Sequence, residues 1–118
     1  MTYIDGFVVP VKAGTTRDEY RAFAGRMAAV VKEHGATRVV EAWGDSVPEG
    51  KHTDFRRAVA AQDGETIVFS WIEWPDKATH DAGMAKVMDD PRMQPGAEGM
   101  PFDGPRMIYG GFEALVDL

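Results

Sequence analysis

Cysteine and asparagine are both absent from this chain of 118 residues, and serine occurs only at Ser46 and Ser70. Without cysteine the chain forms no disulfide, no thiolate nucleophile and no sulfur-ligated metal centre. The two serines belong to no G-x-S-x-G motif, and one falls in a predicted turn and the other in a predicted strand. The sequence therefore gives no support to serine or cysteine hydrolase chemistry.

Long apolar runs are also missing, because no stretch approaches the roughly 18 residues that a membrane-spanning helix requires. The chain shows no positively charged start followed by an apolar segment, as a secretory signal would. These two absences predict a soluble, cytoplasmic protein without a membrane partner. The length fits one domain over residues 1–118, and the 44% hydrophobic content is ordinary for a globular chain.

Positive charge is scarce relative to negative charge, with 13 basic and 19 acidic residues and a formal net charge of −6. The one visible basic cluster holds Lys51, His52, Arg56 and Arg57, and Asp54 interrupts it. Such a balance repels phosphate backbones unless the positive groups gather on one face. We therefore expect a solvated surface loop here and no nucleic-acid partner.

Motifs for metals and phosphates are likewise lacking. The three histidines, His34, His52 and His80, are scattered and form no paired ligand spacing, so no metal site is expected. No G-x-G-x-x-G follows a predicted strand, and no cofactor is expected. His34 falls at a predicted helix end, where a cation complements the helix dipole, and His52 is expected in an exposed loop. His80 shares a helical face with apolar residues, which indicates either a satisfied boundary histidine or a proton carrier.

Hydrophobic periodicity predicts the order strand, helix, strand, strand, helix, strand, which is typical of a ferredoxin-like βαββαβ fold of the α+β class. We expect the following elements: strands over residues 3–11, 37–43, 65–74 and 106–118, a helix capped by Thr15 or Thr16 and stopped by Gly35, and a helix from Asp76 to about Met88. Residues 55–61 fit either a short helix or a hairpin arm. The segment 89–105 has four prolines and three glycines and is predicted to form a long loop.

The predicted strands are apolar on both faces, whereas two helices cover only one face of a four-stranded antiparallel sheet. The second helix is expected to turn His80, Met84, Val87 and Met88 inward. The other face of the sheet then needs a partner, and a second copy of the chain is the simplest one. The sequence therefore predicts a homodimer.

The last quarter of the chain, from Met100-Pro-Phe-Asp-Gly-Pro-Arg-Met through Ile-Tyr-Gly-Gly-Phe to Leu118, joins a turn-forming loop to an alternating strand. This segment resembles the closing motif of the YbaA-like family, uncharacterised bacterial proteins of the dimeric α+β barrel superfamily, and the resemblance extends over nearly the whole chain. It implies two sheets packed face to face as a dimeric barrel. Related barrels include cofactor-free monooxygenases, haem-degrading enzymes, lactone isomerases and dehydratases, so the resemblance suggests a fold and a pocket position rather than a mechanism. The asparagine of the haem-degrading relatives has no counterpart in this chain.

Polar side chains on strands that otherwise read as buried define the candidate site, because inward charges are costly unless paired. Glu41 and Glu73 are such residues, and the candidates for acid-base or oxygenase-like chemistry are Asp5, His80, Arg106 and Tyr109. The candidate ligand-binding residues are Phe7, Phe69, Trp71, Asp103, Met107 and Phe112. One hypothesis is a cofactor-independent, homodimeric protein that binds or converts a small, partly apolar molecule in the barrel. The alternative is a non-catalytic dimeric structural or interaction module, in which Asp5 or Asp103 only accepts hydrogen bonds that fix the loop before the last strand.

Overall fold

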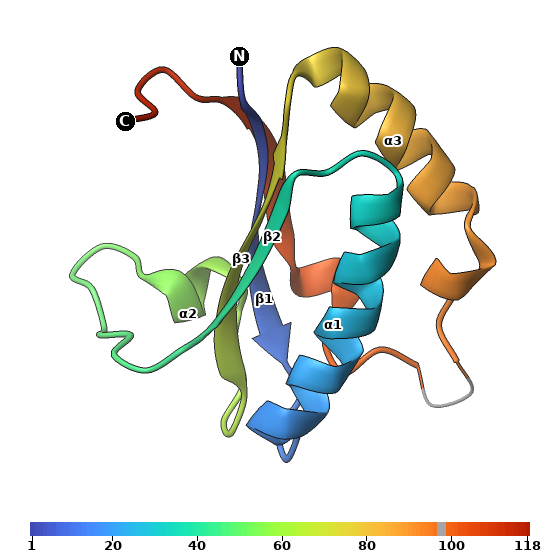
Figure 1. The fold of residues 1–118 in the computed structure, drawn as a ribbon. Coiled ribbons are helices and arrows are strands. Elements are labelled where there is room, and N and C mark those ends of the chain that lie inside the picture. Colours follow the sequence, from blue (N-terminus) through green and yellow to red (C-terminus); the bar gives the residue numbers. More distant parts are fainter. Residues whose placement is uncertain (97–98) are drawn as a thin grey trace.

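The computed structural model describes residues 1–96 and 99–118 and shows an α+β fold built on one four-stranded antiparallel sheet (Figure 1). The elements are β1 (Tyr3–Val11), α1 (Arg17–Glu33), β2 (Arg38–Trp43), α2 (Phe55–Ala58), β3 (Thr66–Trp74), α3 (Lys77–Asp89) and β4 (Ile108–Glu113). Between α3 and β4 the chain forms two short 3-10 turns, at Pro91–Met93 and Gly104–Arg106. The order of these elements is the predicted one, and most of their bounds lie close to those predicted. Residues 55–61 contain a short helix rather than a hairpin arm.

The strands lie in the order β2-β3-β1-β4, and every neighbouring pair is antiparallel. Asp5 lies opposite Ile72, Phe7 opposite Ser70 and Val9 opposite Val68, which places these side chains on one face. Because side chains alternate along a strand, Ile4 and Val8 lie on the other face with Phe69 and Trp71. The sheet therefore has two distinct faces, both rich in apolar groups.

Both long helices begin at side chains that satisfy their first amide groups. Thr16 accepts a hydrogen bond from the Glu19 amide, and the Glu19 carboxylate accepts one from the Thr16 amide, forming a capping box. The Asp76 carboxylate accepts a hydrogen bond from the Thr79 amide at the start of α3. These caps were expected from the sequence, and they fix where each helix leaves the sheet.

The helices α1 and α3 cover one face of the sheet, as Figure 1 shows, and the core lies between them and the strands. Trp74 is fully buried against Val31, Ala36 and Val87, while Val9 and Val11 pack near Tyr20. Gly83 of α3 is part of this packing, because a β-carbon there would collide with the Trp74 ring and the His34 carbonyl. The absence of a side chain at Gly83 thus lets α3 approach Trp74 closely.

The opposite face of the sheet, which we call the open face, carries large apolar groups at its surface. The exposed fractions are 44% for Phe69, 44% for Ile108 and 60% for Phe112. Phe55 of α2 rests on the edge of Phe69, with ring centroids 5.8 Å apart. In Figure 1, α2 and the loop before it lie on this side of the sheet, away from α1 and α3.

Two predicted details were wrong. The last strand covers Ile108–Glu113 rather than 106–118, because Arg106 ends a 3-10 turn and Glu113 already lies opposite Tyr3, the first residue of β1. Beyond that pair the Ala114 amide still donates a hydrogen bond of 3.0 Å to the Thr2 carbonyl, and the regular strand ends at Glu113. Met88 was expected inside, yet its side chain is 70% exposed, since the short apolar stripe of α3 meets the core through Met84 and Val87.

Within the two described ranges, no helix is long and apolar enough to cross a membrane. The predicted long loop at 89–105 holds the first 3-10 turn and the start of the second, which ends at Arg106, and residues 97–98 lie outside the described part of the chain.

Candidate functional site

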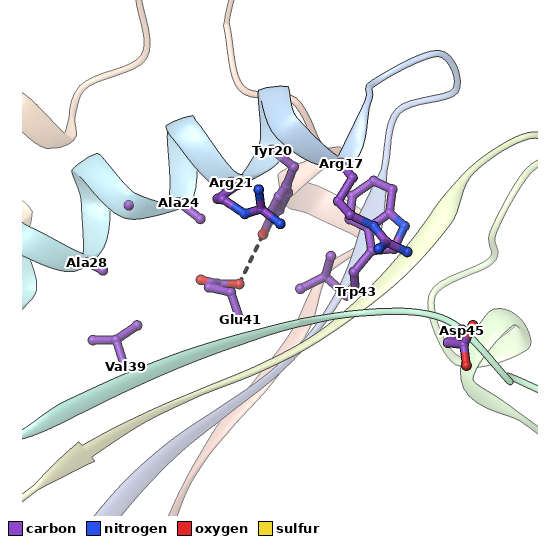
Figure 2. Close-up of a pocket in the computed structure, with 11 residues that line it drawn as sticks. Arg17, Tyr20, Arg21, Ala24, Ala28, Val39, Glu41, Trp43 and Asp45 are labelled. Atoms are coloured by element: carbon purple, nitrogen blue, oxygen red, sulfur yellow. Dashed lines mark hydrogen bonds between the residues drawn. The ribbon is translucent and has the colours of Figure 1, made fainter.

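A groove runs between α1 and the edge strand β2 and encloses about 580 Å³ (Figure 2). Residues from α1, β2, β3 and the turn after β2 line it. They are Arg17, Tyr20, Arg21, Ala24, Gly25, Ala28, Val39, Glu41, Trp43, Asp45 and Val68. The volume falls within the range of small-molecule sites in proteins.

The sequence of α1 explains why space remains here. The residues that face β2 after the first turn are Ala24, Gly25 and Ala28, and none of them reaches the strand. A β-carbon at Gly25 would meet no heavy atom within 4 Å. The groove therefore results from small side chains on one helical stripe opposite the inward residues of β2.

Glu41 lies at the centre of this groove, on the strand face that points toward α1 (Figure 2). Its carboxylate oxygen Oε2 accepts a hydrogen bond of 3.2 Å from the Tyr20 hydroxyl. Burial of the carboxyl raises the pKa of Glu41 above its usual value, and hydrogen bonds from Ser70 and Tyr20 offset this only in part. Among the described residues, no cation contributes to the pKa shift of Glu41.

The pKa of the Tyr20 hydroxyl is also raised. Burial first, and the nearby Glu41 carboxylate second, raise the pKa of Tyr20 well above its usual value. Tyr20 is therefore a neutral donor toward Glu41 at physiological pH. Although Glu41 as a whole residue is exposed along the groove, its carboxyl points toward α1, where desolvation acts on it.

An apolar cavity of about 180 Å³ continues from the groove beneath α1. Tyr20, Ala24, Ala28, Val39 and Glu41 line both spaces, so the two adjoin at the small side chains of α1. The further lining is almost wholly apolar and comes from the sheet, α1 and the chain after α3. These residues are Phe7, Val9, Phe23, Met27, Val31, Ser70, Ile72, Met93, Met100, Phe102 and Met107.

Two arginines stand at the end of the groove where α1 begins. Arg17 and Arg21 are four residues apart, and Figure 2 shows both side chains leaving α1 on the side that carries Tyr20. Arg21 forms an ion pair of 3.0 Å with Asp18, in which both side chains are more than 70% exposed. Exposed pairs of this kind contribute little, so Arg21 exchanges its partner readily.

The predicted residues Asp5 and His80 do meet, but away from the groove. The buried Asp5 carboxylate bonds His80 Nε2 at 2.9 Å and accepts a hydrogen bond of 3.0 Å from the Trp74 indole. The other ring nitrogen of His80 lies 2.8 Å from the Asp81 carboxylate. His80 thus ties α3 to β1, and neither residue lines the groove or the apolar cavity.

Arg106 and Asp103 form a second polar cluster at the opposite end of β1. Arg106 Nε donates to the Asp103 carboxylate at 2.7 Å, and its two terminal nitrogens donate to Glu65 at 2.7 and 2.6 Å. Asp103 therefore fixes the segment before the last strand, as the structural interpretation expected, whereas Asp5 bonds His80 and Trp74 instead of Arg106. The expected convergence of Asp5, Arg106 and Tyr109 does not occur.

The sheet itself separates the predicted apolar lining into two groups. Phe7 and Met107 lie on the helix-covered face and line the apolar cavity. Phe69, Trp71 and Phe112 lie on the open face. Tyr109 stacks on Phe7 at 6.4 Å but is 75% exposed at the edge strand β4. These residues therefore do not share one pocket within a single chain.

Comparison with known proteins identifies the relatives of this chain. Residues 2–104 match the family described as "Protein of unknown function (DUF1428)". The chain belongs to this family. It is also 56% identical over 117 residues, 99% of either chain, to proteins named "Uncharacterized protein YbaA" in Escherichia coli K12 and in Shigella flexneri. The resemblance to YbaA-like proteins drawn from the closing motif is thereby confirmed.

In this DUF1428 chain, sequence reasoning noted Glu41 but placed neither Glu41 nor Tyr20 among the site residues. The signal was present in β2, where Glu41 lies between Val39 and Trp43 on one alternating face. A carboxylate between two inward apolar residues requires either a partner or a function. Across the described ranges, no group of three or more acidic or histidine side chains is arranged to hold a metal ion.

Proposed function

We propose that this DUF1428 protein is a homodimeric small-molecule-binding protein whose ligand occupies the groove between α1 and β2. The observation that carries the proposal is the Glu41 carboxyl, which lies inside the groove and, within residues 1–96 and 99–118, has the Tyr20 and Ser70 hydroxyls as its partners. A carboxyl that is partly desolvated without a neighbouring cation is costly, and perturbed carboxyls of this kind are common at functional sites. A ligand that donates a hydrogen bond to Glu41 would offset that cost.

The shape of the site supports binding of a partly apolar molecule. The groove supplies the polar groups, and the adjoining apolar cavity offers a place for the body of the ligand. Ligand sites generally combine an apolar lining with a few polar anchors. Glu41 and Tyr20, which line both spaces, and the two arginines of the groove provide such anchors.

The homodimer part of the proposal rests on the open face. Phe69, Ile108 and Phe112 expose large apolar surfaces there, as predicted from strands that are apolar on both faces. The strand order β2-β3-β1-β4, with α1 and α3 on one face, supports a ferredoxin-like arrangement. Two such sheets packed through their open faces would form the dimeric barrel that the YbaA-like resemblance implies.

The structure supports ligand binding more strongly than catalysis, because the candidate proton carriers lie in two separate parts of the molecule. Glu41 and Tyr20 lie in the groove, whereas Asp5 and His80 are engaged with Trp74 and Asp81. An acid-base reaction needs its donor and acceptor around one substrate. Beside Tyr20, which stays neutral, the groove supplies one carboxyl, that of Glu41, while Asp45 lies apart from this pair (Figure 2).

The test is a thermal-shift screen of the purified protein against small organic acids, aromatics, lactones and quinones, since a ligand of the folded state raises the melting temperature. Gly25→Leu fills the groove from α1 without a collision at the β-carbon. Ala29→Leu changes an exposed position of the same helix that lines neither space, and serves as its matched control.

We expect at least one compound to raise the melting temperature of the parent protein and of Ala29→Leu, but not that of Gly25→Leu. A shift that survives in Gly25→Leu would place the ligand elsewhere and overturn the proposal. If every class leaves the melting temperature unchanged, the chain is better described as a dimeric interaction module without a ligand.

A further inference from the structure

We infer that the ligand of the groove is a small carboxylic acid that has an apolar body and a hydrogen-bond donor, hydroxyl or ammonium, beside its carboxylate. This inference rests on the proposed binding function and specifies its chemistry. It follows from three features of the combined space: two arginines from the start of α1, Glu41 on the β2 side and the adjoining apolar cavity. Each feature complements one part of such a molecule.

The arginines provide the carboxylate-binding part. Arg17 and Arg21 present two guanidinium groups from the first two turns of α1, and guanidinium groups match carboxylate geometry well. Arg17 is absent from the ion pairs found among residues 1–96 and 99–118. A positive side chain in the first turn of a helix is unfavourable for the helix itself, so Arg17 does not serve α1 stability.

Glu41 provides the acceptor for the donor group. Its Oε2 atom accepts from the Tyr20 hydroxyl, and the carboxyl has acceptor capacity beyond that bond. Glu41 and the two arginines line the same groove from opposite sides, β2 and α1. A molecule that carries both an anion and an adjacent donor can satisfy both sides at once, whereas a plain anion would leave Glu41 without a new partner.

The remaining charges around the groove do not cancel this arrangement. Asp18 pairs with Arg21 only in an exposed contact, which an entering carboxylate can replace. Asp45 lines the groove beyond Trp43, at the end where Arg17 also lies, and Figure 2 shows it apart from the Tyr20–Glu41 pair. The apolar cavity adjoins at Ala24 and Ala28, on the side away from Asp45.

The test uses four compounds with the same phenyl body and measures their affinities by isothermal titration calorimetry. Phenylalanine and 3-phenyllactate carry both the carboxylate and a donor, 3-phenylpropanoate lacks the donor, and phenethylamine lacks the carboxylate. We expect the two complete compounds to bind at least about tenfold more tightly than phenethylamine, because a charge-assisted contact to arginine is lost. We also expect the two complete compounds to bind at least about threefold more tightly than 3-phenylpropanoate, because 3-phenylpropanoate offers no donor to Glu41.

Variants assign each preference to its side chain. Arg17→Ala/Arg21→Ala should remove the advantage of the carboxylate, and Arg26→Ala, an exposed arginine of α1 outside the groove, should leave it intact. Glu41→Leu should remove the preference for a donor. Glu41→Gln keeps an acceptor oxygen but removes the negative charge, so it should weaken binding of phenylalanine more than that of 3-phenyllactate, which distinguishes the two donors.

The outcomes separate this inference from the function on which it rests. Binding of phenethylamine as tightly as phenylalanine, or a carboxylate preference that survives loss of both arginines, overturns the inference while leaving a ligand-binding groove. If none of the four compounds binds and the broader thermal-shift screen also finds no ligand, both fail together. If the screen finds only neutral or cationic ligands in the groove, the inference alone fails.

Discussion

Arg106 holds Glu65 through two parallel hydrogen bonds, one from each terminal nitrogen, at 2.7 and 2.6 Å. The Glu65 side chain is 6% exposed, so this pair is largely removed from water. Arg106 also donates to the Ala60 carbonyl and to Asp103. Arg106 therefore joins the segment before β3 to the segment before β4. It has a structural role and does not line the groove.

Replacing Arg106 should destabilise the fold. We expect Arg106→Ala to lower the free energy of unfolding by about 3–5 kcal/mol, because a buried carboxylate loses its cation. Arg38→Ala removes a more exposed pair, with Glu73 at 3.4 Å, and should cost about 0–1 kcal/mol. Urea denaturation measures both. Equal midpoints for Arg106→Ala and the parent protein would show that the clamp adds no stability.

Acid should weaken the same clamp. Hydrogen bonds from Arg106 lower the pKa of Glu65 from 4.5 to about 2. Because the folded pKa lies below the unfolded one, this contribution is complete above about pH 4.5 and is lost as the pH falls toward 2. Its size is about 3 kcal/mol as an upper estimate. The stability difference between the parent and Glu65→Gln should shrink over this range in denaturation at stepped pH, and a constant difference would contradict the assignment.

Two helical glycines should respond oppositely to the same change. Gly83→Ala places a β-carbon against the Trp74 ring and the His34 carbonyl, so it should destabilise the protein despite the better helix propensity of alanine. Gly25→Ala meets open space and should stabilise it by about 0.5–1 kcal/mol. Thermal denaturation compares the pair. A stabilising Gly83→Ala would mean that α3 does not pack closely on Trp74.

The open face should control association. Phe69→Glu and Phe112→Glu each place a charge in the apolar patch, and we expect either to convert the proposed dimer to monomers, since a desolvated unpaired charge is costly. Met88→Glu alters an exposed methionine on α3, outside the open face, and should leave the dimer intact. Sedimentation velocity reads the mass directly. A parent protein that is already monomeric at micromolar concentration would refute the dimer.

Much of the fold followed from local patterns in the sequence. Alternation along residues 3–11 and 66–74, the Thr16 and Asp76 caps and the stop at Gly35 each depend on neighbouring residues, so they were predictable. The end of β4 was not, because it depends on where β1 begins on the adjacent strand. Met88 was misplaced because four apolar or neutral residues on α3 suggested a wider buried stripe than the core accepts.

The site was harder to predict than the fold, because it depends on which residues lie opposite one another across the core. Arg106 was predicted to be a ligand anchor because its partner Glu65 lies 41 residues away in the chain, and the sequence does not indicate that pairing. Asp5 and His80, 75 residues apart, were grouped correctly, yet their partners make them a link between α3 and β1. The groove exists because α1 has only small side chains opposite Glu41. The sequence alone does not show that this stretch of α1 packs over β2.

The most direct test of the account is an NMR titration of the ¹⁵N-labelled protein with 3-phenyllactate, or with the strongest compound from the screen, which maps the binding site by amide shift changes. The account predicts saturable changes centred on Ala24, Gly25, Ala28 and Glu41, which line the groove. Changes centred instead on Asp5 and His80, or on the open face around Phe69, would contradict the assignment of the groove as the ligand site.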